Sequence, residues 1–538
     1  MRKRFSVGTL LGVIVLSLGL GAMLNHVLSA DSIYDQITKF QDVLSLTQKN
    51  YVDNVDPQKL TEAAINGLLG QLDPHSVYIP ASQMQRVTEE FQGSFEGIGI
   101  EFQVLNDTLM VVSPVTGGPS EALGILGGDK IVKINDSSCV GITQEGVQKK
   151  LRGPKGTHVK VTIVRAGIKN PLDFDITRDN IPIYTVDAAY MVDDQTGYIS
   201  VSRFAATTHD EFMEAMTKLK AAGMQRMVLD LRQNAGGYLE QAFKMVDELM
   251  PGDRKIVYTK GRRSEFDEEY VSSGNGKYTN VPLIILVNNA SASASEIVAG
   301  AIQDWDRGLI VGETTFGKGL VQRQYMLRDG SAFRLTTARY YTPSGRLIQR
   351  PYDHDRANYA REAFERTEVE GENITHTEEQ DSTRPKFKTM GGRVVYGGGG
   401  ITPDYIVKAD RLNEYTVQLR SHNVFPEFAN RYLEQHGTAL RQEYGKDCAR
   451  FVKSFEMTKP MLDQIVAIGK EQKVEFRDSS YEQDLHFIKA FAKAYIARSL
   501  FGNEGSSRTI LGEDNQFAKA MKLFDEAERI NAHMTSLH

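Results

Sequence analysis

Two apolar stretches constrain the fold of this chain most strongly. They read "MVLDL" at residues 227–231 and "VPLIILV" at residues 281–287. Strands with so few polar residues are buried on both faces, which is typical of parallel sheets. Each stretch is followed by Gly or Ser and then by a helical pattern, and "RGLIVGETTFG" returns as a strand. Residues 171–350 therefore predict an α/β fold built from βαβ units.

The regions around this segment follow other patterns. Residues 31–90 carry apolar side chains at helical spacing, whereas residues 94–165 combine short strand patterns with one amphipathic helix, which indicates a compact β-rich module. Residues 351–390 are mostly polar, so we expect a surface insert that is partly flexible. Residues 411–538 are helical again and are typical of a packing or oligomerisation element.

The amino-terminal residues predict export. Basic residues at positions 2–4 precede an uncharged apolar run from Phe5 to Leu24. This arrangement is typical of a signal peptide, and about 20 apolar residues can also span a bilayer as a helix. We therefore expect the rest of the chain in the periplasm or cell envelope. Cleavage of residues 1–30 and their retention as an inner-membrane anchor, with the membrane association that follows, stay open as alternatives.

Charge and cysteine content argue against two classes of function. The formal net charge is -6, which provides no basic surface for nucleic acid. Cys139 and Cys448 stand far apart, and no CxxC motif or Cys/His cluster accompanies them, which argues against a structural zinc site. The two cysteines are compatible with a disulfide or with two free thiols. No cofactor or metal is expected.

A cluster of serines at residues 291–295 predicts a nucleophile. It reads "SASAS" and opens an apolar helical pattern. A serine hydroxyl needs a base before it becomes a useful nucleophile. None of the 11 histidines lies within residues 291–322. His75 and His209 are the two histidines that could fold back onto the cluster, since triad members occur in any chain order.

Lys318, in "TTFGKGLVQ", is the other candidate base. A lysine amine acts as a base only when it is neutral, and an apolar pocket lowers its pKa toward the working pH. Glycines at 317 and 319 permit a sharp turn, and apolar residues at 316, 320 and 321 surround it in the sequence. Taken alone, this local pattern favours a glycine turn with a solvated lysine.

Four stretches change this balance when they are taken together. They are "SASASEIVAGAIQDWDRGLIVGETTFGKGLVQ", "MVLDLRQNAGGYLEQA", the module with "GSFEGIGIEF" and "GGDKIVKIND", and "GGGGITPD". In content and order they resemble the carboxy-terminal processing peptidases, also called tail-specific proteases (peptidase family S41), and "LDPHSVYIP" before the module fits too. The resemblance covers roughly residues 31 to 410, and several rare strings in order are more specific than one short motif.

The resemblance implies the fold and the domains. It implies an α/β chain (α+β as a multidomain whole) with a βαβ-spiral serine protease core of the ClpP/crotonase-like type, an inserted PDZ domain and a helical C-terminal region. The expected domains are a signal peptide or membrane anchor (1–30), a helical segment (31–90), a PDZ domain (91–168), the peptidase core (169–410, including the polar insert 351–390) and a helical region (411–538).

The resemblance also implies a Ser–Lys dyad. The family serine is the middle one of the cluster, here Ser293, and the family lysine lies in Phe-Gly-Lys-Gly, here Lys318, 25 positions later. Gln322, four positions after the lysine, is expected to hydrogen-bond the amine and hold it in place. Ser295 is expected to cap the following helix, and Ser291 to end the preceding strand.

An oxyanion hole is expected from backbone N–H groups beside the nucleophile. Ala294, directly after the serine, is one donor. The "QNAGGY" loop supplies the other, with Gly236 as the donor and Gly237 as the conformational hinge. Asp230 and Arg232, just before this loop, are expected to form a charged pair that braces the end of the strand.

Residues 94–165 resemble a PDZ domain, which binds a C-terminal carboxylate in a backbone loop and adds the peptide as a strand. The expected loop residues are Gly97, Ile98, Gly99 and Ile100. The helix within "GITQEGVQKKLRG" is expected to form the opposite wall of the groove, through Thr143, Val147 and Leu151. A β-rich module used only for packing is the alternative.

The implied function is a serine endopeptidase that recognises substrate C-termini and processes or degrades envelope proteins through an acyl-enzyme. Its partners are protein substrates with free C-termini, and the resemblance also implies an adaptor or regulatory protein that opens the site. A homo-oligomer is compatible with the helical tail. Two alternatives stay open: a non-catalytic PDZ scaffold or pseudoprotease of the envelope, and a serine hydrolase whose base is His75 or His209.

Overall fold

The computed structural model describes residues 17, 33–105, 107–366, 370–373 and 384–536. They belong to two compact units, residues 1–78 and 79–538. The expected export segment lies outside the described residues except for position 17. Across the ranges that the structure describes, no helix combines the length and the apolar character needed to cross a membrane.

In the first unit, the described residues from 33 onward form the helices α2 (Ile33–Asn50) and α3 (Pro57–Gly70). Asp56 starts α3, because its carboxylate accepts hydrogen bonds from the first-turn amides, and Pro57 has the backbone angle that suits the first helical position. No side chain of α2 is buried, and most of the apolar ones expected at helical spacing are exposed. Strand β1 (Val77–Ile79) follows.

The β-rich module follows helix α4 (Ala81–Gln92) and forms a sheet in the order β3-β4-β5-β7-β8. Its strands and helices are β2 (Ser94–Gly97), β3 (Ile100–Leu105), β4 (Thr108–Pro114), α5 (Pro119–Ala122), β5 (Lys130–Ile134), β6 (Ser137–Ser138), α6 (Gln144–Leu151), β7 (His158–Val164), β8 (Leu172–Thr177) and β9 (Asp179–Pro182). Because β8 pairs with β7 and β9 returns to pair with β2, the module continues past the boundary expected at residue 168.

The α/β core is built on a sheet in the order β10-β11-β12-β15-β16-β22-β19. The strands from β11 to β22 run parallel, and β10 and β19 are antiparallel to their neighbours. The two apolar stretches form β12 and β15, as predicted. The elements are β10 (Val186–Met191), β11 (Thr196–Val201), α7 (Thr208–Ala221), β12 (Arg226–Asp230), α8 (Leu239–Asp247), β15 (Leu283–Val287), α9 (Ala294–Asp304), β16 (Leu309–Gly312), β19 (Gly371–Glu372) and β22 (Tyr405–Ile406).

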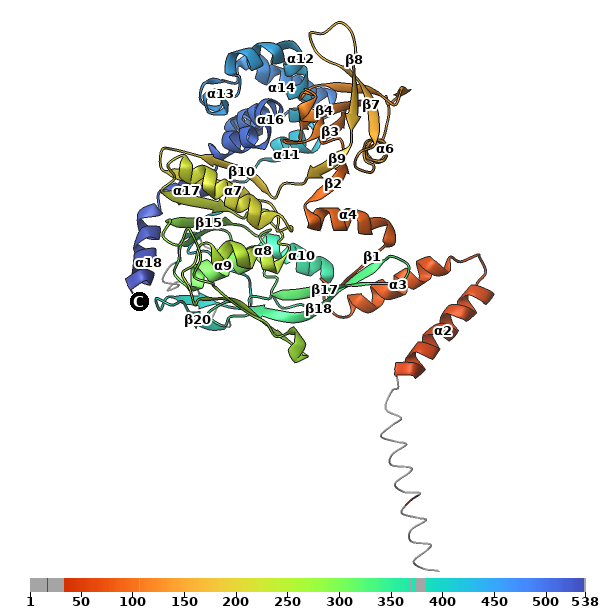
Figure 1. The fold of residues 1–538 in the computed structure, drawn as a ribbon, viewed down its shortest axis with the longest axis vertical. Coiled ribbons are helices and arrows are strands. Elements are labelled where there is room, and N and C mark those ends of the chain that lie inside the picture. Colours follow the sequence, from red (N-terminus) through yellow and green to blue (C-terminus); the bar gives the residue numbers. More distant parts are fainter. Residues whose placement is uncertain (1–16, 18–32, 106, 367–369, 374–383, 537–538) are drawn as a thin grey trace, which may run out of the picture. The chain divides into compact units, whose positions relative to one another are not determined.

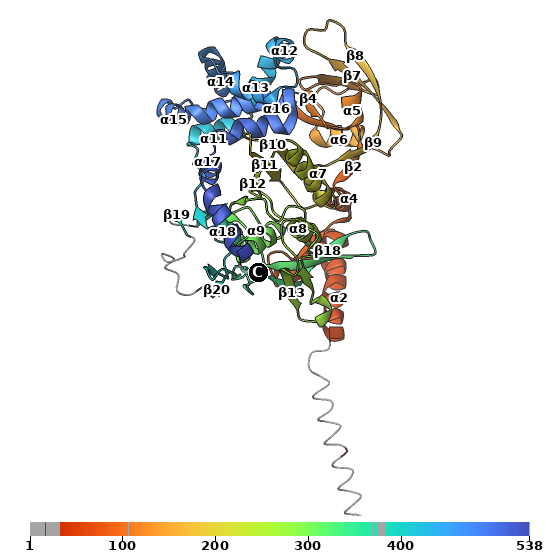
Figure 2. The ribbon, with the colours of Figure 1, turned by 60° about the vertical axis from the view of Figure 1, so that its left-hand side comes forward.

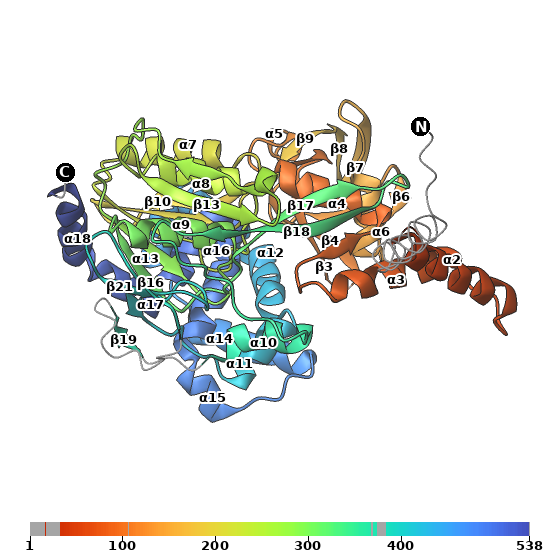
Figure 3. The ribbon, with the colours of Figure 1, turned by 90° about the horizontal axis from the view of Figure 1, so that it is seen from below.

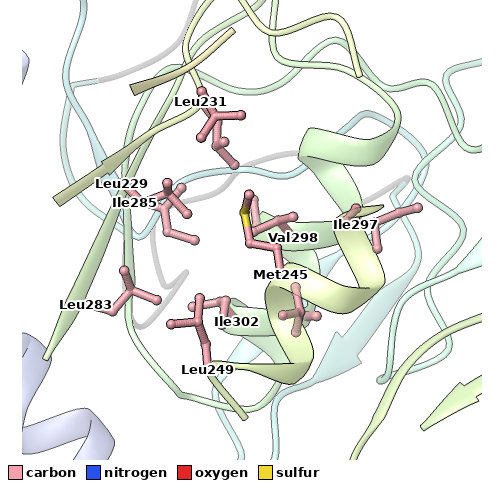
Figure 4. Close-up of a cluster of buried hydrophobic side chains, with 14 of the residues drawn as sticks. Leu229, Leu231, Met245, Leu249, Leu283, Ile285, Ile297, Val298 and Ile302 are labelled. Atoms are coloured by element: carbon pink, nitrogen blue, oxygen red, sulfur yellow. The ribbon is translucent and has the colours of Figure 1, made fainter. Parts of the chain in front are cut away.

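Successive residues of these strands pack against opposite layers. Leu229 and Ile285 face α8 and α9 in one apolar cluster (Figure 4), whereas Val228 and Ile284 belong to a cluster with the C-terminal helices. Figures 1 and 2 show α7, α8 and α9 together beside the sheet and α17 and α18 near its other face. Truncating a buried leucine such as Leu229 to alanine is expected to cost about 2–5 kcal/mol. Packing on both faces of the sheet therefore holds the parallel strands, and the positions of their ends, in place.

A second, antiparallel sheet follows the order β17-β18-β13-β14. Figure 3 shows β17 and β18 side by side as a long hairpin. Lys318 stands just before this hairpin and Gln322 lies within its first strand. The elements are β13 (Lys255–Gly261), η1 (Ser264–Phe266), β14 (Glu269–Val271), β17 (Leu320–Met326) and β18 (Ala332–Tyr341).

The polar insert contributes one helix to the fold. Its first part forms α10 (Arg356–Glu365), which buries Tyr359 and Ala363 and leaves most of its other residues exposed, as a surface insert does. Tyr359 packs edge-on against Phe316, with ring centroids 5.8 Å apart. Two short strands follow the insert's middle, β20 (Lys386–Lys388) and β21 (Val394–Tyr396). Residues 367–369 and 374–383 lie outside the described residues.

The C-terminal region is helical, as predicted, and it divides into two parts. The helices from α11 to α16 share a separate apolar core, while α17 and α18 bury their apolar side chains against the core sheet. The second part thus completes the packing of the core sheet. The helices are α11 (Glu414–Ser421), α12 (Val424–Tyr444), α13 (Cys448–Ser454), α14 (Lys459–Glu471), α15 (Asp478–Gln483), α16 (Leu485–Leu511), α17 (Asn515–Met521) and α18 (Phe524–Ser536).

The two cysteines are free thiols in separate places, so they do not form the disulfide that the sequence left open. Cys139 is buried in the β-rich module and donates to the carbonyl of Ile131 at 3.0 Å. Cys448 begins α13. Burial raises the pKa of the Cys448 thiol to about 11, which keeps it protonated and poorly reactive at neutral pH.

Candidate active site

The three clustered serines have different surroundings. The hydroxyl of Ser291 donates to the carbonyl of Leu231 at 2.8 Å, and it also accepts the amide of Asn288. The hydroxyl of Ser295 donates to the carbonyl of Asn234 at 2.9 Å, from within the first turn of α9, so Ser295 does not cap the helix as expected. Both side chains are fully buried. Ser293, which is partly accessible, is therefore the serine of this cluster that can meet a substrate.

Ser293 holds the N-cap position of α9 in a left-handed conformation, with φ 55° and ψ −112°. A non-glycine residue in this region is strained, and such residues concentrate at functional sites. The strain persists because α9 is buried along its whole length and cannot move easily. Ser293 therefore lies on the tight turn between β15 and α9, at the N-terminus of a buried helix.

Glu296 connects the serine turn to the loop that carries Lys318. The Glu296 side chain is fully buried. One carboxylate oxygen accepts the amides of Ser293 and Lys318, both at 2.8 Å. The other accepts the amide of Gly317 at 2.7 Å and the hydroxyl of Thr315 at 2.6 Å. Burial raises the pKa of Glu296, and these four donors act against that rise. A single carboxylate thus fixes two loops that are far apart in the sequence.

Tyr340, on β18, makes a second connection between the same two loops. Its hydroxyl lies 3.0 Å from the carbonyl oxygen of Ser293 and 2.6 Å from that of Lys318. Burial raises the pKa of Tyr340 well above its usual value, so the phenol stays protonated and can donate. Glu296 thus binds the amides of Ser293 and Lys318, and Tyr340 binds their carbonyls. The backbones of the two residues are therefore fixed relative to each other.

The side chain of Lys318 is directed by the hairpin that follows it. Its amine donates to the side-chain oxygen of Gln322 on β17 at 2.9 Å. Lys318 is partly buried. This is the hydrogen bond expected for the orienting glutamine, and it holds the amine of a long, flexible side chain near the start of β17.

The glycine loop after β12 lies against the serine. A β-carbon added at Gly236 would lie 2.8 Å from the Cβ of Ser293 and 2.9 Å from the nitrogen of Ala294, and φ here is +97°. Only glycine fits this close approach. At Gly237 an added β-carbon would lie 2.0 Å from the carbonyl oxygen of Phe204. Gly236 therefore lets the loop pass close to Ser293, and Gly237 lets it pass close to Phe204.

Two of the expected oxyanion donors, Ala294 and Gly236, differ in the hydrogen bonds that their amides make. Ala294 is the first residue of α9, and first-turn amides of a helix lack an i−4 acceptor within it. The amide of Gly236 instead donates to the side-chain oxygen of Asn234 at 2.9 Å. An oxyanion at this place would share or replace that acceptor. Asn234 itself is fully buried, and its carbonyl accepts the amide of Ala292 at 3.0 Å.

The two histidines considered as alternative bases belong to different units of the chain. His209, near the start of α7, has Nδ1 3.4 Å from a carboxylate oxygen of Asp210 and Nε2 3.5 Å from one of Glu248. Both of its ring nitrogens therefore face carboxylates. His75 belongs to the first unit, where its amide donates to Asp73 at 2.7 Å.

Asp230 and Arg232 pair as expected, at 2.6 Å, and Arg232 also pairs with Asp514.

The β-rich module contains a groove of about 240 Å³ beside the edge strand β3. An edge strand offers unpaired backbone groups to an added strand. The groove is lined by Phe95, Ile98, Gly99, Ile100, Glu101, Phe102, Gln148, Leu151 and Arg152. It therefore has the backbone loop, the strand edge and the helical wall that the capture of an extended peptide requires.

Two of the expected groove residues, Thr143 and Val147, do not line the groove. Thr143 is the N-cap of α6, where its side chain accepts the amide of Gly146. Val147 is fully buried in the core of the module. Leu151 lines the groove as expected, together with Gln148 of the same helix and Arg152, which directly follows it. Gly97 ends β2, just before the loop.

The sequence gives no distinctive signal for two further residues of this site. Tyr340 lies in an ordinary strand pattern, and Asn234 lies in a loop whose distinctive residues are its glycines. Ile401, in the "GGGGITPD" stretch, exchanges backbone hydrogen bonds with the Lys318 loop: its carbonyl accepts the amide of Thr315 at 3.1 Å, and its amide donates to the Thr315 hydroxyl at 2.7 Å. The association of that stretch with the other three motifs therefore reflects contact in space.

Four parts of the chain match known families. Residues 195–355 match peptidase family S41, and residues 86–164 match the PDZ domain. Residues 22–82 match the N-terminal domain of the activating protease CtpB. Residues 415–502 match a family of unknown function.

Similar proteins cover most of the chain. A carboxy-terminal-processing protease of Bartonella bacilliformis is 40% identical over 59% of this chain and 73% of its own length. Carboxy-terminal processing protease CtpA of Bacillus subtilis is 34% identical over 60% of this chain and 68% of its own. Among solved structures, a photosystem II D1 C-terminal processing protease is 29% identical, with a TM-score of 0.32, over 58% of this chain and 89% of its own. This chain belongs to peptidase family S41, the carboxy-terminal processing proteases, and carries a PDZ domain.

Proposed function

We propose that this protein is a serine endopeptidase that binds the free C-terminus of a protein substrate in its PDZ groove and cleaves with a Ser–Lys dyad. Ser293 is the nucleophile, Lys318 the base and Gln322 the residue that orients the base. The observation that carries this proposal is the pair of connections through Glu296 and Tyr340, which fix the backbones of Ser293 and Lys318 to each other.

The chemistry follows from this arrangement. The neutral amine of Lys318 takes the proton of the Ser293 hydroxyl as the oxygen attacks the scissile carbonyl. The hydrogen bond from the amine to Gln322 uses one N–H of the neutral amine and orients it. The oxyanion is stabilised by the amide of Ala294 and by the Gly236–Gly237 loop. The lysine ammonium then protonates the departing amine, and water hydrolyses the acyl-enzyme.

The groove of the PDZ domain supplies the selection of substrates. The loop from Ile98 to Ile100 receives the terminal carboxylate, and the peptide pairs with the edge of β3. Occupation of the groove leads the substrate chain to Ser293 as an extended strand. The substrates are proteins of the cell envelope, reached through export by residues 1–30, with an adaptor or regulatory protein as a further partner.

Cleavage of an unfolded protein tests this proposal. The substrate is supplied with a free apolar C-terminus or with that end blocked, and the products are identified by mass spectrometry. Wild type should cut the free-ended substrate only, and Ser293→Ala should cut neither. A wild type that binds the C-terminal peptide but cuts neither substrate would favour a non-catalytic PDZ scaffold.

The identity of the base needs its own comparison. Lys318→Ala, His75→Ala and His209→Ala are compared for the release of an acyl product. Lys318→Ala should abolish acylation, while the two histidine variants should retain it. Loss of acylation in a histidine variant with retention in Lys318→Ala would make this a serine hydrolase of another type.

A further inference from the structure

The polar insert reaches the loop that carries Lys318. Arg366, directly after α10, donates from one guanidinium nitrogen to the carbonyl of Thr315 at 2.9 Å and to that of Gly399 at 3.0 Å. Its other terminal nitrogen donates to the carbonyl of Phe316 at 3.0 Å. Three hydrogen bonds from one fork-shaped cation to backbone carbonyls are specific in geometry, and lysine could not reproduce them.

A second arginine connects the same loop to α10. Arg350 donates through Nε to the carbonyl of Phe316 at 2.7 Å and through a terminal nitrogen to the carbonyl of Tyr359 at 2.9 Å. Its guanidinium also stacks on the rings of both residues, 4.6 Å and 4.1 Å from their centroids. Cation–π contacts of buried arginines add to such hydrogen bonds.

The loop is thus held from two sides by opposite charges. The amides of Gly317 and Lys318 donate to the carboxylate of Glu296. The carbonyls of Thr315 and Phe316 accept from the arginines. Since the Lys318 amine is otherwise directed through a flexible side chain, the position of its backbone decides where the amine stands relative to Ser293.

We propose that the insert is part of the catalytic apparatus of this chain, and that Arg366 is a positioning residue for Lys318. This inference rests on the proposed role of Lys318 as base. Without Arg366, the carbonyls of Thr315 and Phe316 lose a donor, the loop moves away from α10, and the amine of Lys318 becomes more solvated. A misplacement of about 1 Å far from the reacting atoms can lower a rate by about 100-fold.

The test measures the rate at which a fluorophosphonate probe labels the active-site serine of the full chain across a range of pH. In Arg366→Ala the rate constant should fall by roughly 10-fold to 100-fold. Its acidic limb should also move to higher pH, because a better solvated amine has a higher pKa and stays protonated longer. Arg366→Lys should recover only part of the rate. Binding of a peptide with a free apolar C-terminus should stay unchanged.

Arg361→Ala is the matched control. Arg361 lies on the same helix, its side chain is 64% exposed, and it pairs with Glu365 of the same helix, so its rate and pH profile should equal those of wild type. The inference is overturned if Arg366→Ala labels like wild type, or if it only lowers the fraction of protein labelled with rate constant and pH limb unchanged. Failure of the proposed function would look different, as labelling that survives Lys318→Ala.

Discussion

At Ser293, a fully buried carboxylate and a buried phenol bind both loops of the proposed dyad, and a glycine loop passes close to the serine. At the PDZ groove, an edge strand, a backbone loop and the partly exposed wall of α6 surround an open space. The first site is fixed by side chains that come from distant elements. The second is defined mainly by backbone, which accommodates many sequences.

This difference separates the effects of substitution. A change among the buried polar groups of the serine site disturbs reacting geometry, which appears in kcat. A change on the wall of the groove alters only how tightly a tail is held, which appears in KM. Four substitutions or conditions, taken from the largest expected effect to the smallest, test this separation.

Gly236→Ala should be the most damaging. The new β-carbon would collide with Ser293, at 2.8 Å, in a backbone conformation that alanine rarely adopts. We expect kcat/KM to fall by about 100-fold or more, measured by cleavage of an unfolded substrate. Gly223→Ala is the matched control, since φ is also +97° there and the nearest atom to an added β-carbon is 3.8 Å away. Equal losses in both variants would mean that backbone strain alone explains the effect.

Glu296→Gln should lower both stability and kcat. The amide has one oxygen where the carboxylate has two, so its NH₂ group would face two of the four donors. Buried donors left unpaired cost about 1–3 kcal/mol each, which thermal unfolding would detect. Glu240→Gln, an exposed change in the first turn of α8, should have no measurable effect. A Glu296→Gln enzyme with normal kcat would show that the carboxylate does not hold the dyad.

Gln148→Glu should affect the groove alone. The new carboxylate would face the terminal carboxylate of a bound tail, and an exposed charge pair changes binding by at most about 1 kcal/mol, roughly fivefold. KM should rise by up to that factor while kcat stays constant. Gln144→Glu adds the same charge to α6 outside the groove lining and should change neither. A change of kcat without a change of KM would break the separation between the two sites.

The pH dependence of stability should show the smallest effect. Because burial raises the pKa of Glu296 above its usual 4.5, the folded state binds the proton more tightly than the unfolded state does. The stabilisation that this tighter proton binding gives the folded state is fully present below pH 4.5. It is lost as pH rises through the raised pKa of Glu296 in the folded state. The stability advantage of wild type over Glu296→Gln should therefore narrow with rising pH. An advantage that widens over this range would mean that the pKa is lowered.

The strands could be predicted from the sequence because their signal is local: the run at residues 283–287 is apolar at every position. The proposed dyad of Ser293 and Lys318 rests instead on the resemblance of several motifs taken together, since the local pattern at Lys318 alone favours a solvated lysine. The connections between them could not be predicted. Tyr340 has the appearance of any strand tyrosine, and its role depends on where β18 packs. In the sequence, Glu296 indicates only a favourable charge at the start of a helix, because its partners Gly317 and Lys318 lie about 20 positions further on.

The groove residue that was wrong and the unpredicted contacts of the insert have physical causes as well. Val147 follows the helical spacing of a groove residue, but burial in the module core takes precedence at that position. Arg366 belongs to the insert, whose polarity predicts exposure, and Arg350 directly precedes it. Guanidinium groups nonetheless pack well on aromatic rings and backbone carbonyls. The polar composition of this segment therefore did not predict that it contacts the site.

The most direct test of the account is the position of a covalent adduct on the active-site serine. The full chain is treated with a fluorophosphonate, digested, and mapped by mass spectrometry. We predict one modified residue within 291–295, namely Ser293, and no adduct in that segment of Ser293→Ala or of Lys318→Ala. An adduct on Ser291 or Ser295, or labelling of Ser293 at the wild-type rate in Lys318→Ala, would contradict a nucleophile and base held together by Glu296 and Tyr340.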